Sequence, residues 1–375
     1  MSTRTDPSRL LPSLGPATVA ALFHGVEGGI APPLDSGAWA HDADTIVKQR
    51  LAGLALLSAD SSKVALSSAT LSRLNQARGI ETARCLMIEA AAVTALGALE
   101  DAGIPLVVTK GPAVALAYPH ASLRPFFDVD ALVPPDRFEE AFRILDRLGF
   151  AEPSHQVQPR GYFNRWCREG VNLIRSDGGS IDLHHHIPPW VWGRRLAFDA
   201  VFGRSRMIPI AGGPVRAAHP IHNLLITTLH VISDKGQPGR RLLIWRDLVA
   251  LARVSEPGAV AAEARRVSLD WLLSFVLRQL PQAVQPRDLV DALGRPRAPS
   301  GDAARLRRLL PPALGSRHQI AQAYRLPVPQ AAAFVVGYTL PSRTFLRARY
   351  GDGASTLRWW RDAVFRLRSA RGAAA

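Results

Sequence analysis

The chain has 375 residues, 47% of them hydrophobic, which is typical of a soluble protein with two or three domains. Its two cysteines, Cys85 and Cys167, are too few for a disulfide framework and match no zinc motif, so we expect a cytoplasmic protein. The N-terminus lacks a signal-peptide pattern, and no apolar run reaches the roughly 18 residues of a membrane span, so no membrane partner is expected.

The first hundred residues are predicted to be helical behind a short tail. Residues 1–40 mix Ser, Pro and Gly, which predicts a poorly ordered tail with one short helix near 17–23. Residues 41–103 predict a helical segment, because apolar residues recur at helical spacing. The apolar face of its longest helix, expected over 81–102, consists of Leu86, Ala90, Val93, Leu96 and Leu99. We expect these helices to cover a sheet.

Residues 104–117 predict a buried strand, a tight turn and a short helix. The strand is expected over 104–108, and Gly111 permits an unusual backbone conformation or the close approach of a ligand. Pro112 suits the first position of a helix, whose N-terminus presents free N–H groups to an anion. Lys110, one of only four lysines, adds a positive charge suited to a triphosphate. The alternative is that Lys110 is an ordinary surface lysine.

Two aspartates in the next predicted strand are the strongest chemical signal. Asp128 and Asp130 are two residues apart, so a strand projects both carboxylates to one face. Buried carboxylates so close repel each other, and a divalent metal such as Mg²⁺ is the simplest cation to lie between them. An isolated Asp-x-Asp is more often a solvated strand end, so the prediction depends on its surroundings. For Arg124, just before this strand, clamping a phosphate and pairing with Asp128 are equally open.

A hairpin further along the chain adds a third carboxylate. After a helix expected over 135–149, strand-like runs at 171–175 and 180–186 flank a Ser-Asp-Gly-Gly turn. Alternation places Asp182 and His184 on one face, where we expect them beside the aspartate pair. Three carboxylates on adjacent strands can hold two metal ions and deprotonate an incoming hydroxyl.

The three consecutive histidines at 184–186 do not predict a zinc site. Strand alternation sends His185 away from its neighbours, and no Cys lies at a typical ligand spacing. His184 is expected to support the metal ligands from behind or to contact the substrate, and an ordinary structural histidine is the alternative.

Residues 218–375 predict a helical, Arg-rich accessory region. We expect it to cover one side of the cleft that holds the aspartates and to select the acceptor molecule that reacts there. The net charge of +15 is concentrated after residue 256, where 19 arginines and no lysine accompany 7 acidic residues. A basic face of this kind could bind RNA. The alternative is the compositional bias of a GC-rich genome.

These motifs together resemble the uncharacterised nucleotidyltransferase family of the DNA polymerase β-like superfamily. The resemblance covers roughly residues 80–255 and rests on Lys110-Gly111, on Arg124 with Asp128-Val129-Asp130, and on Ile181-Asp182-Leu183-His184. It implies an α/β (α+β) fold: a small mixed-sheet catalytic domain, expected over 104–217, with helical N-terminal and C-terminal additions. His230 and Asp247 also match common family positions, without an implied role.

Two departures from the superfamily pattern concern the phosphate site. Gly-Ser usually stands where this chain has Gly111-Pro112, so a serine contact to the phosphates is absent, and Lys110 or Arg124 is expected to replace it. The interval from Gly111 to Asp128 is also longer than is common. Neither departure removes a carboxylate.

The predicted function is Mg²⁺-dependent transfer of NMP from an NTP, expected to be ATP, to an acceptor with release of pyrophosphate. The expected catalytic residues, which also bind two Mg²⁺, are Asp128, Asp130 and Asp182. The expected nucleotide-binding residues are Lys110, Gly111 and Arg124. The acceptor is expected to be a small molecule, a peptide or a protein. Two alternatives are transfer to RNA, such as a tRNA end, and a non-catalytic nucleotide-binding protein on the same fold.

Overall fold

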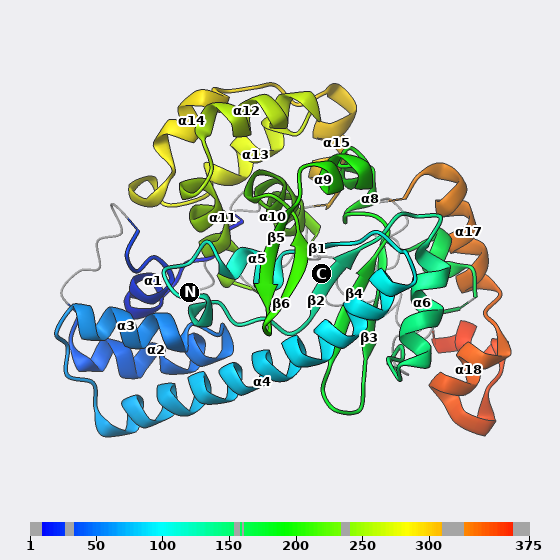
Figure 1. Cartoon of the computed structure of the whole chain (residues 1–375), viewed down its shortest axis with the longest axis horizontal. Helices are drawn as coiled ribbons and strands as arrows, with labels where there is room; N and C mark the ends of the chain where they lie inside the picture. The colour runs from blue at the N-terminus through cyan, green and yellow to red at the C-terminus, as the bar shows by residue number, and fades with distance from the viewer. Residues whose placement is uncertain are drawn as a thin grey trace.

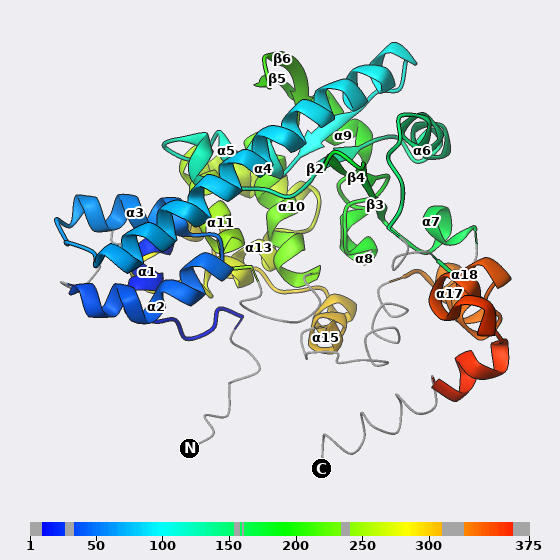
Figure 2. The same cartoon turned by 90° about the horizontal axis from the view of Figure 1, so that it is seen from below.

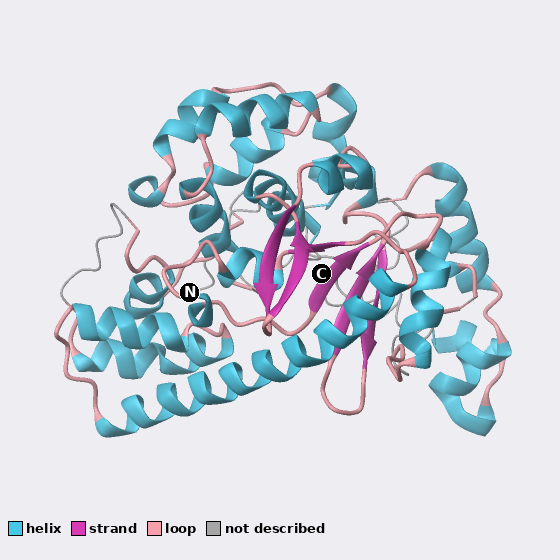
Figure 3. Cartoon of the chain, viewed as in Figure 1, coloured by secondary structure: helices cyan, strands magenta, loops and turns pink. Residues whose placement is uncertain are grey.

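The computed structural model describes residues 10–26, 34–153, 158–159, 161–233, 241–309 and 326–362. A six-stranded mixed sheet lies at its centre, with the strand order β3-β4-β2-β1-β6-β5 (Figures 1 and 3). The strands are β1 (Val107–Thr109), β2 (Val129–Leu132), β3 (Gly170–Ile174), β4 (Ser180–His184), β5 (Arg206–Ile210) and β6 (Gly213–Ala217). This sheet and the helices around it confirm the predicted α/β class with helical additions.

The central strands bring the predicted motifs together. β2 and β4 run parallel, with Asp130 opposite Asp182 and Leu132 opposite His184. β1 runs antiparallel to β2 and places Thr109 opposite Asp130. β3 and β4 form the predicted antiparallel hairpin. Because side chains alternate along each strand, this register puts the two aspartates on one face of the sheet, as predicted.

The edge hairpin of β5 and β6 was not predicted. Pro209 lies in β5 and Pro214 in β6, and proline weakens a strand pattern because it cannot donate to a ladder. β5 is an edge strand, where proline is tolerated, and β6 pairs with β1 only through Val108 and Ala217. The hairpin therefore forms one edge of the sheet, although its sequence does not show a clear alternation of apolar and polar residues.

One face of the sheet is covered by two helices, α4 (Ser68–Asp101) and α6 (Phe138–Arg147) (Figure 1). The buried side of α4 consists of Ile88, Ala91, Ala92, Ala95, Leu96 and Leu99. The predicted face is wrong at its first two positions, since Leu86 and Ala90 are exposed. With about 100° of rotation per residue, Leu86 and Ala90 lie on the side of α4 opposite Ala95 and Leu99, so they point away from the sheet.

The other face of the sheet packs on helices from both ends of the chain. The N-terminal ones are α1 (Pro16–Leu22), α2 (Ser36–Lys48) and α3 (Ala52–Ser61). The C-terminal ones are α10 (Pro220–Ser233), α11 (Leu243–Arg253), α12 (Pro257–Arg266), α13 (Asp270–Leu277), α14 (Arg287–Leu293) and α15 (Ser300–Leu309). Their buried residues form one continuous hydrophobic core. Both helical additions therefore belong to the same body.

The predicted poorly ordered tail over 1–40 is wrong for residues 10–26 and 34–40. Leu10, Leu22 and Phe23 are buried in the shared core. Asp42 of α2 accepts hydrogen bonds from the backbone N–H of Thr18 at 2.9 Å and from its hydroxyl at 3.2 Å. The apolar residues of α1 and this buried link outweigh the glycine-rich and proline-rich composition on which the prediction rested. The predicted short helix near 17–23 is confirmed.

The C-terminal Arg-rich part is helical where it is described, as predicted. α17 (Val328–Thr339) and α18 (Arg343–Tyr350) lie apart from α12–α14, beside α7 (Phe163–Trp166) (Figure 2). Phe163 and Phe334 form a small separate core there. The remaining short helices are α5 (Gly111–Ala115), η1 (Ala121–Leu123), α8 (Trp190–Gly193), α9 (Phe198–Gly203), η3 (Gln282–Val284) and η4 (Gly351–Gly353).

Among the described helices, α4 is long and apolar enough to cross a membrane by length and composition, with a mean hydropathy of 1.4 over its best window. Arg84, Glu89 and Glu100 interrupt its apolar residues, so α4 does not contain the uninterrupted apolar run of roughly 18 residues considered in the sequence analysis. The C-terminal half of α4 packs on the sheet, which accounts for the apolar residues on that side.

Candidate functional site

A cavity of about 410 Å³ opens at the face of the sheet that carries the aspartates. Asp128, Asp130 and Asp182 line it from the sheet, and Thr227 and His230 line it from α10. The turn between α2 and α3, residues 48–50, forms a further wall. The cavity is of the size and shape that suits a small ligand, and its charged walls favour a polar one.

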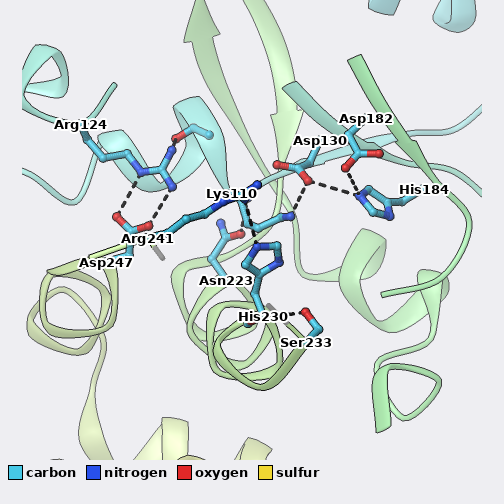
Figure 4. Close-up of polar contacts among 11 residues, drawn as sticks. Lys110, Arg124, Asp130, Asp182, His184, Asn223, His230, Ser233, Arg241 and Asp247 are labelled. Atoms are coloured by element: carbon cyan, nitrogen blue, oxygen red, sulfur yellow. Dashed lines mark hydrogen bonds and ion pairs between the residues drawn. The ribbon is translucent and has the colours of Figure 1, made fainter. Parts of the chain in front are cut away.

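Three possible metal ligands lie close together at the edge of this cavity: Asp130, Asp182 and His184, whose ligand atoms all lie within 4.8 Å of one another (Figure 4). His184 Nε2 is 3.0 Å from Asp182 Oδ2 and 3.3 Å from Asp130 Oδ1. Lys110 Nζ approaches Asp130 Oδ1 at 2.5 Å from the other side. Lys110 and His184 thus both contact the buried carboxylates. His184 lies beside the possible metal ligands, and not behind them as predicted.

The turn that carries Lys110 has a constrained backbone. Lys110 has a φ of 49° and Gly111 a φ of +33°, both outside the usual range for residues with side chains. A Cβ on Gly111 would lie 3.3 Å from the carbonyl oxygen of Asp128, so glycine also allows the two segments to approach closely. The predicted unusual backbone at Gly111 is confirmed.

Asn223 of α10 holds this turn, and the sequence analysis missed it. Its side-chain oxygen accepts a hydrogen bond from the N–H of Lys110 at 3.0 Å, and its amide nitrogen donates to the carbonyl of Ala218 at 3.0 Å. Asn223 is 1% exposed, so both bonds are sheltered from water. The only sequence signal is a polar residue among the apolar residues of α10.

Arg124 does not pair with Asp128, which was one of its two predicted roles. It forms a bidentate pair with Asp247 of α11, from Nε to Oδ1 at 3.1 Å and from Nη2 to Oδ2 at 2.8 Å. Its Nη1 donates to the carbonyl of Gly111 at 3.2 Å, and the Tyr118 hydroxyl donates to Asp247 at 2.7 Å. Asp247, whose role the sequence left open, therefore anchors Arg124 beneath the Lys110–Gly111 turn (Figure 4).

A family model described as "Uncharacterised nucleotidyltransferase" matches residues 35–283, which is more than half of the chain. The chain belongs to this family. A search of the curated proteins finds no match. The family membership agrees with the resemblance drawn from the Lys-Gly, Asp-x-Asp and Ile-Asp-Leu-His motifs.

Two solved structures are similar to this nucleotidyltransferase. One is the solution structure of the antibiotic-resistance factor ANT(2'')-Ia, with 18% identity and a TM-score of 0.33 over 51% of this chain and 90% of that one. The other is the crystal structure of an antigenic nucleotidyltransferase-like protein from Paracoccidioides brasiliensis. It has 16% identity and a TM-score of 0.34 over 57% of this chain and 95% of that one.

Electrostatics in the nucleotidyltransferase site reflect burial first and neighbouring charges second. Burial, followed by the charges of Asp130 and Asp182, raises the pKa of Asp128 to about 6. Burial raises the pKa of Asp182, but the charge and hydrogen bond of His184, together with the charges of Lys110 and Arg168, outweigh burial and lower that pKa below its ordinary range. Burial lowers the pKa of Lys110, yet the three carboxylates outweigh burial and raise it. The three carboxylates thus stabilise positive charge in the cavity.

The pKa values of His184 and His230 shift in opposite directions. Burial lowers the pKa of His184, but Asp182 and Asp130 outweigh burial and raise it to about 10. Burial lowers the pKa of His230 well below its ordinary value, and Lys110 and Arg241 lower it further. His230 therefore lines the cavity as a neutral imidazole, with Nε2 at 3.4 Å from Nη1 of Arg241.

The donor set fits a divalent cation. Asp130 and Asp182 offer carboxylate oxygens, which Mg²⁺ prefers, and His184 adds an imidazole nitrogen, which is more common around transition metals. Asp128 lines the same cavity but is not part of the group within 4.8 Å. Within the described part of the chain, the structure thus groups two of the three predicted ligands with His184.

Glu81 of α4 is half-buried near Arg50 and Arg84 and gives a pH-dependent prediction. Burial raises its pKa to about 7, against an ordinary value of 4.5, although Arg50 and Arg84 oppose the shift. The folded protein therefore prefers protonated Glu81, and this stability, complete below pH 4.5, is lost as the pH rises to about 7. Glu81→Gln should raise the free energy of unfolding at pH 8 by about 1–2 kcal/mol, after allowance for solvent screening.

Urea unfolding of wild type and Glu81→Gln at pH 4 and pH 8 measures this effect. Glu100→Gln, at an exposed position on the same helix, is the matched control and should show no gain that depends on pH. An equal stability difference for Glu81→Gln at both pH values would contradict the assignment.

Proposed function

We propose that this protein transfers NMP from an NTP to an acceptor hydroxyl and releases pyrophosphate. The observation that supports this most directly is the parallel pairing of β2 and β4, which sets Asp130 opposite Asp182 at the cavity with Lys110. Family membership supports nucleotidyl transfer in general. Mg²⁺, ATP and the acceptor class are parts of the proposal.

Each site residue has a proposed role in this reaction. Asp130 and Asp182 would hold a divalent metal with His184 once its imidazole is neutral, and Asp128 would contribute to a second ion. A metal ion bound there would neutralise negative charge on the transferring phosphoryl group. The acceptor oxygen forms a bond to the α-phosphorus, and the bond from that phosphorus to the bridging oxygen of the β-phosphate breaks. Asp182 accepts the acceptor proton, and pyrophosphate carries away the electron pair.

Incubation with Mg²⁺ and each of four NTPs labelled at the α-phosphate tests the proposal. The incubation is run with total RNA, with protein extract and with metabolite extract, and the labelled product and released pyrophosphate are measured. Label in the metabolite or protein fraction is the expected result and names the acceptor class. Label in RNA would replace the proposed acceptor, and NTP binding without label in any fraction would favour a non-catalytic nucleotide-binding protein.

A further inference from the structure

The two residues predicted to hold the NTP phosphates are already engaged within the protein. Lys110 Nζ lies 2.5 Å from Asp130, and Arg124 is occupied by both oxygens of Asp247 and by the carbonyl of Gly111. Using either one for a triphosphate would separate a buried ion pair, which costs several kcal/mol. Arg124 therefore acts as a positioning residue, and other cations must be available for the phosphates.

Three other cations at the cavity form no ion pair with a described residue, and Arg241 Nη1 lies 3.4 Å from Nε2 of His230. Lys48, Arg50 and Arg241 line the cavity, and no ion pair joins any of them to a described carboxylate. The Arg50 guanidinium stacks on the ring of Phe127. Burial, followed by the charge of Arg241, lowers the pKa of Arg50 to about 10. Arg50 and Arg241 therefore lie close enough to repel each other, although the charges of Glu81 and Asp128 partly offset this repulsion. Such a pair is suited to a polyanion.

The backbone at Arg50 forms a defined turn at the end of α2. Arg50 N–H bonds to the carbonyl of Val47 at 3.0 Å and Leu51 N–H to that of Ile46 at 2.9 Å, which is a Schellman motif at the end of α2. Arg50 occupies its left-handed position with a φ of 60°, where glycine is usual. This turn fixes the backbone from which the Arg50 side chain reaches the cavity.

A link to α11 fixes the turn against the rest of the site. The side-chain oxygen of Gln49 accepts a hydrogen bond from the N–H of Leu242 at 2.9 Å. Leu242 directly follows Arg241 and precedes α11, so this bond holds the two cation-bearing segments together. Leu51 is fully buried and anchors the turn in the core. The cations are therefore held at the cavity by a rigid frame.

We propose that Arg50 and Arg241, with Lys48 at the rim, bind the β- and γ-phosphates of the NTP and the pyrophosphate that leaves. This inference rests on the proposed function and extends it to the N-terminal helical addition, outside the predicted catalytic domain. The carboxylates and the cations line one cavity, where the proposed triphosphate would contact both. The triphosphate would thus contact residues from both helical additions.

Calorimetric binding to three probes in Mg²⁺ tests the inference without turnover. The probes are the ATP analogue with an α,β-methylene bridge, inorganic tripolyphosphate, and AMP, which lacks the tail. Arg50→Gly and Arg241→Ala should each weaken binding of the first two about 10- to 100-fold, the effect of losing a charge-assisted hydrogen bond. Binding of AMP should change less than about threefold.

Lys63→Gly is the matched control for Arg50→Gly. Lys63 has a φ of 54° and occupies the same position of a second Schellman motif, after α3, but it is exposed and does not line the cavity. Both variants remove one positive charge and place glycine where the backbone favours it. Lys63→Gly should therefore leave all three affinities unchanged.

The outcomes separate this inference from the proposed function. Unchanged tripolyphosphate binding in Arg50→Gly and Arg241→Ala, or an equal loss for AMP, overturns the inference while transfer activity still supports the function. Tripolyphosphate binding that depends on Arg50, in a protein that transfers no NMP, supports the phosphate site and overturns the function. Wild type that binds none of the probes overturns both.

Discussion

Asp130→Asn is expected to lower the rate of NMP transfer by at least about 10³-fold. Asp130 is 3% exposed and lies opposite Asp182 in the sheet, where its carboxylate also contacts Lys110 and His184. The amide keeps the shape of the side chain but removes the negative charge that binds a metal ion. Asp182 and Asp128 remain to balance the nearby cations, so we expect the fold to stay intact.

Asp146→Asn makes the same change at an exposed position of α6 and should leave transfer unchanged. Circular dichroism and thermal unfolding of both variants show whether lost transfer reflects the site or the fold. If Asp130→Asn lowers stability strongly, Asp182→Asn, at a less buried carboxylate, provides the second measurement. A folded Asp130→Asn protein that retains most of its transfer activity would remove Asp130 from the catalytic residues.

The sequence was sufficient for the part of the site that depends on strand periodicity. Asp130, Asp182 and His184 lie in short strands with apolar neighbours, and a period of two residues fixes the face on which each side chain lies. The hairpin turn at 176–179 carries its own local signal. The mixed class of the sheet follows from the same elements, which is why the fold around these residues was predicted correctly.

The partners of the predicted residues could not be read from local patterns. Arg124 and Asp247 are separated by 123 positions, and Lys110 and Asn223 by 113. Such pairs depend on how α10 and α11 dock on the sheet, and helix periodicity gives the buried face but not the neighbour across it. The same limit applies to Arg50, because helical spacing predicted that residues 41–103 cover the sheet but not that the turn after α2 lines the cavity.

Asp247→Asn is expected to lower the free energy of unfolding by about 3–5 kcal/mol, because it leaves a buried guanidinium without its counter-charge. The side chain of Arg124 is 11% exposed and that of Asp247 is 4% exposed, so water cannot replace the lost carboxylate. Transfer should fall as well, since Arg124 also holds the carbonyl of Gly111 in the turn that carries Lys110. Urea unfolding and transfer assays measure the two effects.

The surface pair of Arg175 with Asp177 provides the matched control, because it is also bidentate but its carboxylate is about half exposed. Asp177→Asn should leave the unfolding midpoint nearly unchanged. The double variant Arg124→Gln with Asp247→Asn removes both buried charges and keeps an acceptor for Tyr118, so it should recover at least about 1 kcal/mol relative to Asp247→Asn. If stability returns while transfer stays low, Arg124 positions the phosphate-side turn. Equal small losses for Asp247→Asn and Asp177→Asn would instead show that the buried pair does not stabilise the site.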